Sequence, residues 1–129
     1  MSISELAKRT NALKARTKDF AIRIFRLVDA LPKSVQGRAV ANQIIRSGTS
    51  VASNYRAACR ARSRAEFIAK IGLVEEEADE TLFWLELIIE TDLLAANKLK
   101  PLLREADEIV SIMAASRKSA IANRQSAIR

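Results

Sequence analysis

The chain has 129 residues, enough for one domain with its own hydrophobic core. Apolar residues make up 49% of it, but it holds only three glycines, two prolines and 5% aromatic residues, which favours long helices with few turns over β-structure. One cysteine and no histidine exclude an intrachain disulfide and the usual zinc ligand sets, so no metal or cofactor is expected. No apolar run approaches roughly 18 residues and no signal-peptide pattern follows the first methionine, so we expect a cytoplasmic protein without a membrane partner.

The net charge of +7 is distributed in blocks. Residues 34–64 carry six arginines and no acidic residue, whereas residues 65–92 carry nine acidic residues and one lysine. The segments before and after these two are net basic. This asymmetry predicts one acidic helix with basic neighbours. Part of the charge can then be neutralised within the fold or across a subunit contact, and the rest forms a basic surface.

Apolar residues recur at helical spacing in four successive stretches. The first apolar stripe runs from Leu6 to Leu31, where the helix should end because a proline follows. The second helix should begin after Ser34, a favourable N-cap, and end near Arg62. Gly48 and its small neighbours in the middle of this helix predict the close approach of another backbone.

The third and fourth helices have their own start signals. Ser63 and Glu66 match a capping box, which predicts that the third helix begins there. Pro101 is acceptable only in a first turn, so the fourth helix should begin near Asn97. From Arg117 onward apolar residues become sparse, and we expect a frayed basic tail.

These segments predict a single all-α domain over residues 1–129, folded as an antiparallel up-down-up-down four-helix bundle. The chain offers no catalytic constellation. Ser50 and Cys59 have no histidine that could act as their base. We therefore expect a protein that is not an enzyme.

The arginines of the second stretch have two interpretations. They can contact phosphates, because arginine binds phosphate in a bidentate manner and several such contacts give salt-dependent affinity. Alternatively, they pair with the acidic helix, within or between subunits. The residues predicted to contact RNA or DNA are Arg56, Arg60, Arg62, Arg64, Lys14 and Lys18. No aromatic residues interleave with the turn arginines, which argues against specific single-strand readout.

A second set of residues is predicted to serve packing or subunit contacts: Arg46, Ser50, Asn54, Glu76, Glu80 and Trp84. Arg46 is interpreted as structural because its spacing places it among small, buried residues. Ser50 and Asn54 are expected to hydrogen-bond across a tight helix crossing.

The acidic cluster on the third stretch also has two interpretations. Glu76 and Glu80 are i,i+4 neighbours that could share a cation, but an acidic face that meets arginines is the simpler interpretation. Asp79 and Glu80 are then the expected pairing partners. Trp84 is interpreted as a core or interface anchor.

Three segments together resemble a known family. They are residues 43–54, which read Gln-x-x-Arg-x-x-x-Ser-Val-x-x-Asn, residues 60–68, an Arg/Ser turn followed by Glu-Phe, and residues 80–85. They are similar to the four-helix-bundle family named for proteins encoded in intervening sequences of bacterial 23S rRNA genes. The resemblance spans roughly residues 20–113.

The resemblance implies a four-helix bundle that assembles into a homopentameric ring. A related accessory protein of diversity-generating retroelements implies nucleic-acid binding through a basic pentamer surface. Arg46, Ser50, Asn54 and Glu80 match the family pattern by position, whereas the family's Glu-Gly and Gly-Ser pairs are replaced by Ala57-Ala58 and Glu76-Glu77.

Two functional hypotheses result. The first is a nucleic-acid-associated oligomer that contacts the RNA or DNA backbone. The second is a structural or adaptor ring whose charges serve self-assembly and a protein partner, without nucleic-acid binding.

Overall fold

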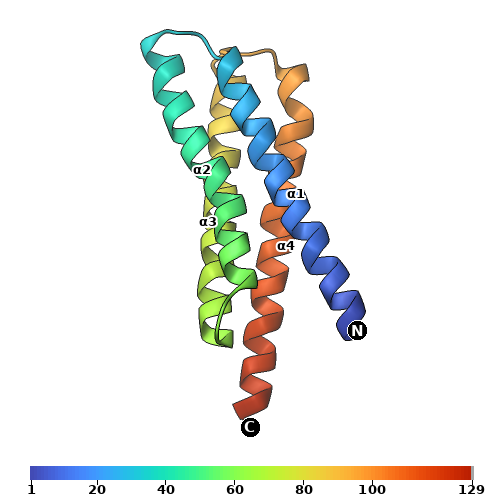
Figure 1. Cartoon of the computed structure of the whole chain (residues 1–129). Coiled ribbons are helices and arrows are strands. Elements are labelled where there is room, and N and C mark those ends of the chain that lie inside the picture. The colour runs from blue at the N-terminus through green and yellow to red at the C-terminus, as the bar shows by residue number, and fades with distance from the viewer. Residues whose placement is uncertain (129) are drawn as a thin grey trace.

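The computed structural model describes the backbone of residues 1–128 and the side chains of residues 1–123. Four helices make up this part of the chain: α1 (Ile3–Ala30), α2 (Val35–Cys59), α3 (Arg64–Glu90) and α4 (Ala96–Ile128). They run alternately up and down (Figure 1), which confirms the predicted all-α four-helix bundle. No described helix carries an apolar stretch that could cross a bilayer.

Serine side chains fix the starts of the first three helices. The hydroxyl oxygen of Ser2 accepts a hydrogen bond from the backbone N–H of Glu5. In the same way, Ser34 accepts from the N–H of Gly37, and Ser63 accepts from the N–H of Glu66. Each serine satisfies an N–H that lacks a partner within its helix. The predicted N-caps at Ser34 and Ser63 are confirmed.

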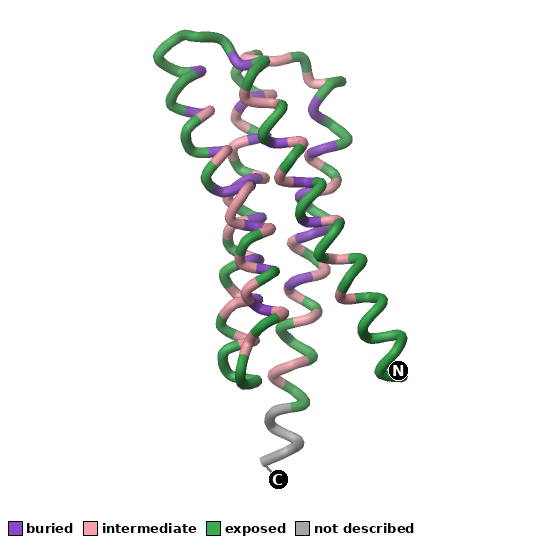
Figure 2. The backbone as a smooth tube through the Cα atoms, viewed as in Figure 1, coloured by how far each residue is buried: buried purple, intermediate pink, exposed green. Residues whose placement is uncertain are grey.

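A continuous apolar core runs along the bundle, visible as the buried positions in Figure 2. Its largest fully buried side chains include Phe20, Ile24, Ile44, Ile71, Leu85, Ile88, Leu99, Ile109 and Met113. Burying a side chain of this size contributes about 1.5–3 kcal/mol, so the core is the main source of stability. Leu6, which the apolar stripe assigned to the core, is 55% exposed. The first half of α1 diverges from the other helices (Figure 1), which accounts for the exposure of residues there.

The middle of α2 contacts both of its neighbours closely. A Cβ atom added to Gly48 would lie 2.8 Å from Cγ2 of Ile24, so only glycine permits the observed approach of α1. On the other side, the hydroxyl of Thr81 donates to Oγ of Ser47 at 2.9 Å, and both residues are fully buried. The prediction of a close approach at Gly48 is confirmed.

Helices α1 and α4 touch little, and an ion pair joins them. Nε and Nη2 of Arg16 each donate to a carboxylate oxygen of Glu105 at 2.7 Å, and Nη2 also pairs with Glu108. The hydrogen bonds from Arg16 hold the pKa of Glu105 below its ordinary value, although partial burial opposes this. This bidentate contact closes the bundle where apolar packing is thin.

Helix α4 begins at Ala96, which agrees with the predicted start near Asn97. The placement of Pro101 in the first turn was wrong, because Pro101 is the sixth residue of the helix. The carbonyl of Asn97 therefore has no N–H to accept from Pro101, and the helix tolerates this because both residues face solvent. Water can hydrate the carbonyl there.

The predicted frayed tail from Arg117 is instead helical, since α4 continues through Ile128. No glycine or proline follows Pro101, so nothing in the sequence interrupts the helix. Nε of Arg117 also lies 3.6 Å from Oε1 of Glu75 on α3, which ties this part of α4 to the bundle. The side chains of Arg124 and Arg129 lie outside the described residues.

Candidate nucleic-acid interface

The antiparallel fold gathers cations from three separate segments at one end of the bundle. The first half of α1, the α2–α3 turn and the last part of α4 all lie at this end (Figure 1). The exposed cations that these segments carry are Lys8, Arg9, Lys14, Arg56, Arg60, Arg62, Arg64, Arg117 and Lys118. A positive end of this kind attracts polyanions over a range of about 10 Å at moderate salt.

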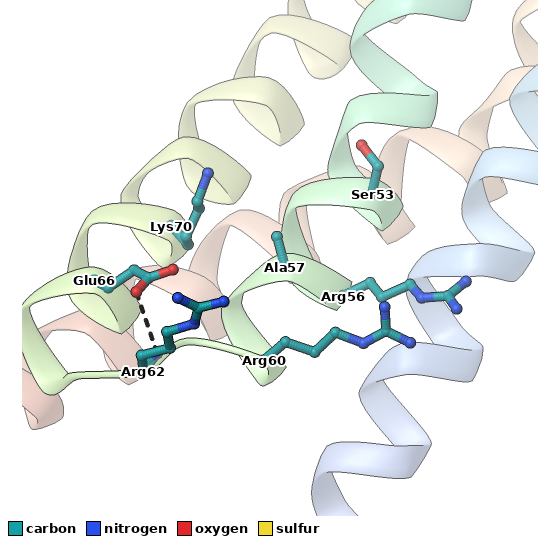
Figure 3. A pocket seen from close by; sticks show the side chains of 7 residues that line it. All are labelled: Ser53, Arg56, Ala57, Arg60, Arg62, Glu66 and Lys70. Atoms are coloured by element: carbon teal, nitrogen blue, oxygen red, sulfur yellow. Dashed lines mark hydrogen bonds between the residues drawn. The ribbon is translucent and has the colours of Figure 1, made fainter.

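The end of α2 and the start of α3 enclose an open groove with a volume of about 490 Å³. Its lining residues are Ser53, Arg56, Ala57, Arg60, Arg62, Glu66 and Lys70 (Figure 3). Four of them are cations and one is a carboxylate. Arg56 and Arg60 project in the same direction, whereas Arg62 rises from the turn between the two helices. The small side chains of Ser53 and Ala57 leave room for a phosphate to approach.

The arginines of this groove have no carboxylate partner among the described side chains. Ion pairs in that part of the chain involve Arg16, Arg46 and Arg117. The one carboxylate in the groove, that of Glu66, accepts a hydrogen bond of 3.2 Å from the backbone N–H of Arg62. Its charge therefore serves the start of α3, where the helix dipole favours an anion. The guanidinium groups remain available to a ligand.

The structure brings only some of the residues predicted to bind nucleic acid together. Arg56, Arg60 and Arg62 line the groove, and Arg64 is exposed just beyond the turn. Lys14 is exposed on α1, whereas Lys18 lies in a separate apolar groove between α1 and α2.

Lys70 was missed, because it is the only cation in a strongly acidic segment. A signal for it existed in its spacing. It follows Glu66 by four residues, and the N-cap at Ser63 places Glu66 in the first turn of α3, beside the arginine-rich turn. Residues one turn apart share a face, so Lys70 extends the groove along α3.

Arg46, in the middle of α2, is not buried as its spacing suggested. Its side chain is 48% exposed, with Nη1 lying 3.1 Å from Oε2 of Glu77, and it forms a second ion pair with Glu80. The structural interpretation of Arg46 nevertheless fits this contact, because the pairs tie α2 to α3. Asp79, which was expected to pair with an arginine, faces solvent, as does Glu76. Only every third or fourth residue of α3 faces α2, and these two do not.

Glu80 also anchors Trp84, whose indole N–H donates to Oε2 of Glu80 at 3.1 Å. Partial burial alone would raise the pKa of Glu80, but the hydrogen bonds from Trp84 and Arg46 outweigh it and hold the pKa below its ordinary value. Trp84 is half-buried and packs against the core. It therefore links the α2–α3 ion pairs to the packing of α3.

The expected hydrogen bond of Ser50 and Asn54 across a helix crossing was wrong. The side-chain amide of Asn54 donates to the backbone carbonyl of Ser50 at 3.0 Å, within α2 itself. The carbonyl one turn back is within easy reach of an amide side chain, so the bond forms locally. The polar contact between helices is instead that of Ser47 and Thr81. No cluster among the described residues is placed to hold a metal ion.

The fold and this surface define a class of protein, a four-helix bundle with a cationic groove at one end. Residues 9–115 match the model of the 23S rRNA-intervening sequence protein family, and the chain belongs to that family. A crystal structure of a protein of unknown function from the S23 ribosomal protein family of Bacteroides thetaiotaomicron is similar, with a TM-score of 0.78 and 35% identity over 84% of this chain and 97% of that chain. No curated protein matches this chain. The family resemblance inferred from the sequence motifs is thus confirmed.

Proposed function

We propose that this protein binds the phosphate backbone of RNA or DNA, without catalysing a reaction, through the groove at the α2–α3 end. The observation that carries the proposal is the set of four cations in one groove whose only carboxylate serves a helix cap. Leaving several arginines side by side without partners costs electrostatic free energy through mutual repulsion. A polyanionic ligand removes that cost.

The chemistry of the groove favours backbone contacts over base readout. Guanidinium groups bind phosphate in a bidentate manner, and a lysine adds a point charge. None of the seven lining residues is aromatic, so the groove offers no platform on which bases could stack. We expect binding that depends strongly on salt and weakly on sequence.

The family resemblance adds a proposal about assembly, namely that the chain forms a homopentamer in the cytoplasm. Repetition of the groove around a ring would let one nucleic acid contact several copies, which raises avidity without any new contact. The alternative of a structural or adaptor ring keeps the assembly and lacks nucleic-acid binding.

Fluorescence anisotropy with labelled duplex RNA and duplex DNA tests the proposal. Between about 50 mM and about 200 mM salt, the logarithm of the association constant should fall linearly with the logarithm of salt concentration, with a slope of about −0.9 for each phosphate neutralised. The variant Arg60→Gln should make that slope shallower by about 1. The control Arg38→Gln removes an exposed arginine at the opposite end of α2 and should leave the slope unchanged.

Absence of binding at about 50 mM salt, or binding that salt does not weaken, would overturn the phosphate mechanism and favour the adaptor ring. Equal effects of the two variants would show that net charge, rather than the groove, determines affinity.

A further inference from the structure

A second groove, between α1 and α2, exposes apolar side chains. It has a volume of about 220 Å³ and is lined by Lys18, Ala21, Ile22, Phe25, Arg26 and Thr49. Phe25 is 58% exposed and Ile22 is 41% exposed. Neighbouring exposed apolar side chains with a polar rim are typical of a surface that another molecule covers. The charged residues that line the groove are Lys18 and Arg26, both positive. The exposed Asp19 and Asp29 lie near it on α1 but are not among its lining residues.

The outer face of α3 has the complementary character. Phe83 is 52% exposed on this face. Glu76, Asp79 and Glu86 precede or follow it by seven, four and three residues, which places them on the same side of the helix. All three are exposed, and none has an ion-pair partner among the side chains that the structure describes. Phe83 is therefore an exposed aromatic ring surrounded by carboxylates.

The position of this ring is fixed by its neighbours. Phe83 packs edge-on against Trp84, with ring centroids 4.9 Å apart and an interplanar angle of 71°. Trp84 is held by its hydrogen bond to Glu80, and Glu80 is held by Arg46 of α2. An aromatic side chain held in place before binding loses less conformational entropy when it binds.

We propose that a second copy of this chain inserts Phe83 into the α1–α2 groove, with its Asp79 and Glu86 opposite Lys18 and Arg26. The groove is large enough, since an apolar cavity of about 150 Å³ already accommodates a benzene ring. Apolar burial supplies affinity, and the opposite charges at the rim select the orientation. The contact adds a specific interface to the proposed oligomer. It uses no residue that lines the groove at the α2–α3 end.

The two surfaces lie on different helices, and the proposed contact is head-to-tail. Each copy that uses its Phe83 keeps its own groove free for the next copy, and the chain of contacts grows until it closes into a ring. Glu80 takes no part, because it is already paired with Arg46 within the chain. Of the two carboxylates predicted to serve packing or subunit contacts, Glu80 thus pairs within the chain.

Complementary variants test this geometry. Sedimentation velocity over a range of concentrations should show self-association of the wild type. Phe83→Ser, which lacks the inserted ring, and Phe25→Asp, which blocks the groove, should each raise the dissociation constant roughly 30-fold or more, as expected for loss of a central aromatic anchor. An equimolar mixture of the two should form a one-to-one heterodimer that grows no further, since only one productive contact remains.

Two controls keep the experiment decisive. Leu73→Ser removes another apolar side chain of α3, one that is 40% exposed, and should assemble like the wild type. Lys18→Glu and Asp79→Lys should each weaken assembly, whereas the chain carrying both should regain it. Circular dichroism should show that every variant keeps its helical content.

A wild type that stays monomeric at all concentrations would overturn the proposal, as would undiminished assembly of Phe83→Ser or a mixture that remains two monomers. These outcomes are distinct from failure of the proposed function. Phe83→Ser should still bind nucleic acid as a monomer with a salt-dependent affinity, and Arg60→Gln should assemble normally.

Discussion

The middle and the carboxy-terminal end of α2 both carry arginines, but these arginines have different neighbours. In the middle, Arg46 faces two carboxylates of α3, Glu77 and Glu80. At the end, Arg56 and Arg60 share a groove with Lys70 and with one carboxylate that a backbone N–H already occupies. The register of α3 against α2 therefore decides which arginine forms ion pairs within the fold and which is available to a ligand.

The two regions also differ in how tightly they are packed. In the middle, Gly48 contacts Ile24 and the hydroxyls of Ser47 and Thr81 meet in the core. At the end, the side chains are exposed and the helix stops at the turn. We expect substitutions in the middle to lower stability and leave binding intact, and substitutions at the end to do the reverse.

The largest expected effect is on binding. The triple variant Arg56→Glu, Arg60→Glu, Arg62→Glu should weaken the binding of duplex RNA or DNA at least roughly 100-fold, because it removes three phosphate contacts and adds repulsion. Its unfolding midpoint in urea should match that of the wild type. A matched variant with Lys33, Arg38 and Lys100 changed to Glu has the same net charge and should bind almost normally. Equal losses in both would show that net charge, rather than the groove, determines affinity.

The next largest effect is on stability in the middle of α2. Gly48→Val should cost about 1–3 kcal/mol, because its side chain would overlap Ile24. Gly72→Ala is the control, since the added Cβ would meet only Cδ of Arg117 at an ordinary 3.6 Å. It should stabilise the protein by about 0.5–1 kcal/mol, the helical preference of alanine over glycine. Urea unfolding measures both, and a Gly48→Val variant as stable as the wild type would contradict the close helix approach.

A smaller loss of stability is expected at the buried hydroxyl pair. Thr81→Val keeps the shape of the side chain but leaves Oγ of Ser47 without its donor, at a cost of about 1 kcal/mol. Thr17→Val is the matched control, because the equally buried hydroxyl of Thr17 bonds only to carbonyls of its own helix. If both variants lost the same stability, the contact between α2 and α3 would have no special role.

The smallest effect concerns pH. The folded-state pKa of Glu80 lies below its ordinary value of 4.5, because Trp84 and Arg46 favour the carboxylate more than partial burial disfavours it. The carboxylate therefore stabilises the fold above pH 4.5, and this contribution is lost as the pH falls through the lower folded-state pKa.

Glu80→Gln should reduce that loss of stability on acidification, measured as the urea midpoint between neutral and acidic pH. Glu76→Gln, on the exposed side of the same helix, should leave the pH dependence unchanged. Identical curves for Glu80→Gln and the wild type would show that the pair with Arg46 contributes nothing to folding.

Much of the fold could be predicted from the sequence, because the signals that set it are local. The caps at Ser34 and Ser63 and the spacing of apolar residues act within one or two helical turns. The predictions failed where a distant segment decides the outcome. Leu6 has the right spacing for the core, but α1 diverges from α4 and leaves it exposed.

The candidate site was predicted in part for the same reason. Arg56, Arg60 and Arg62 stood out because residues 34–65 include no acidic residue. Lys70 was hidden by the acidic residues that follow it, and Lys18 was grouped with the arginines although the fold places it in another groove. Charge along the chain therefore indicated the kind of surface but not all of its members.

The sequence by itself determined four amphipathic helices, their order, their caps and an unequal distribution of charge, since each depends on residues only a few positions apart. The tertiary structure alone decided that Glu77 and Glu80 neutralise Arg46, that Lys70 joins the turn arginines, and that Phe25 and Phe83 stay exposed. The physical reason is that ion pairing and burial depend on the relative register and tilt of whole helices, which the sum of all core contacts sets.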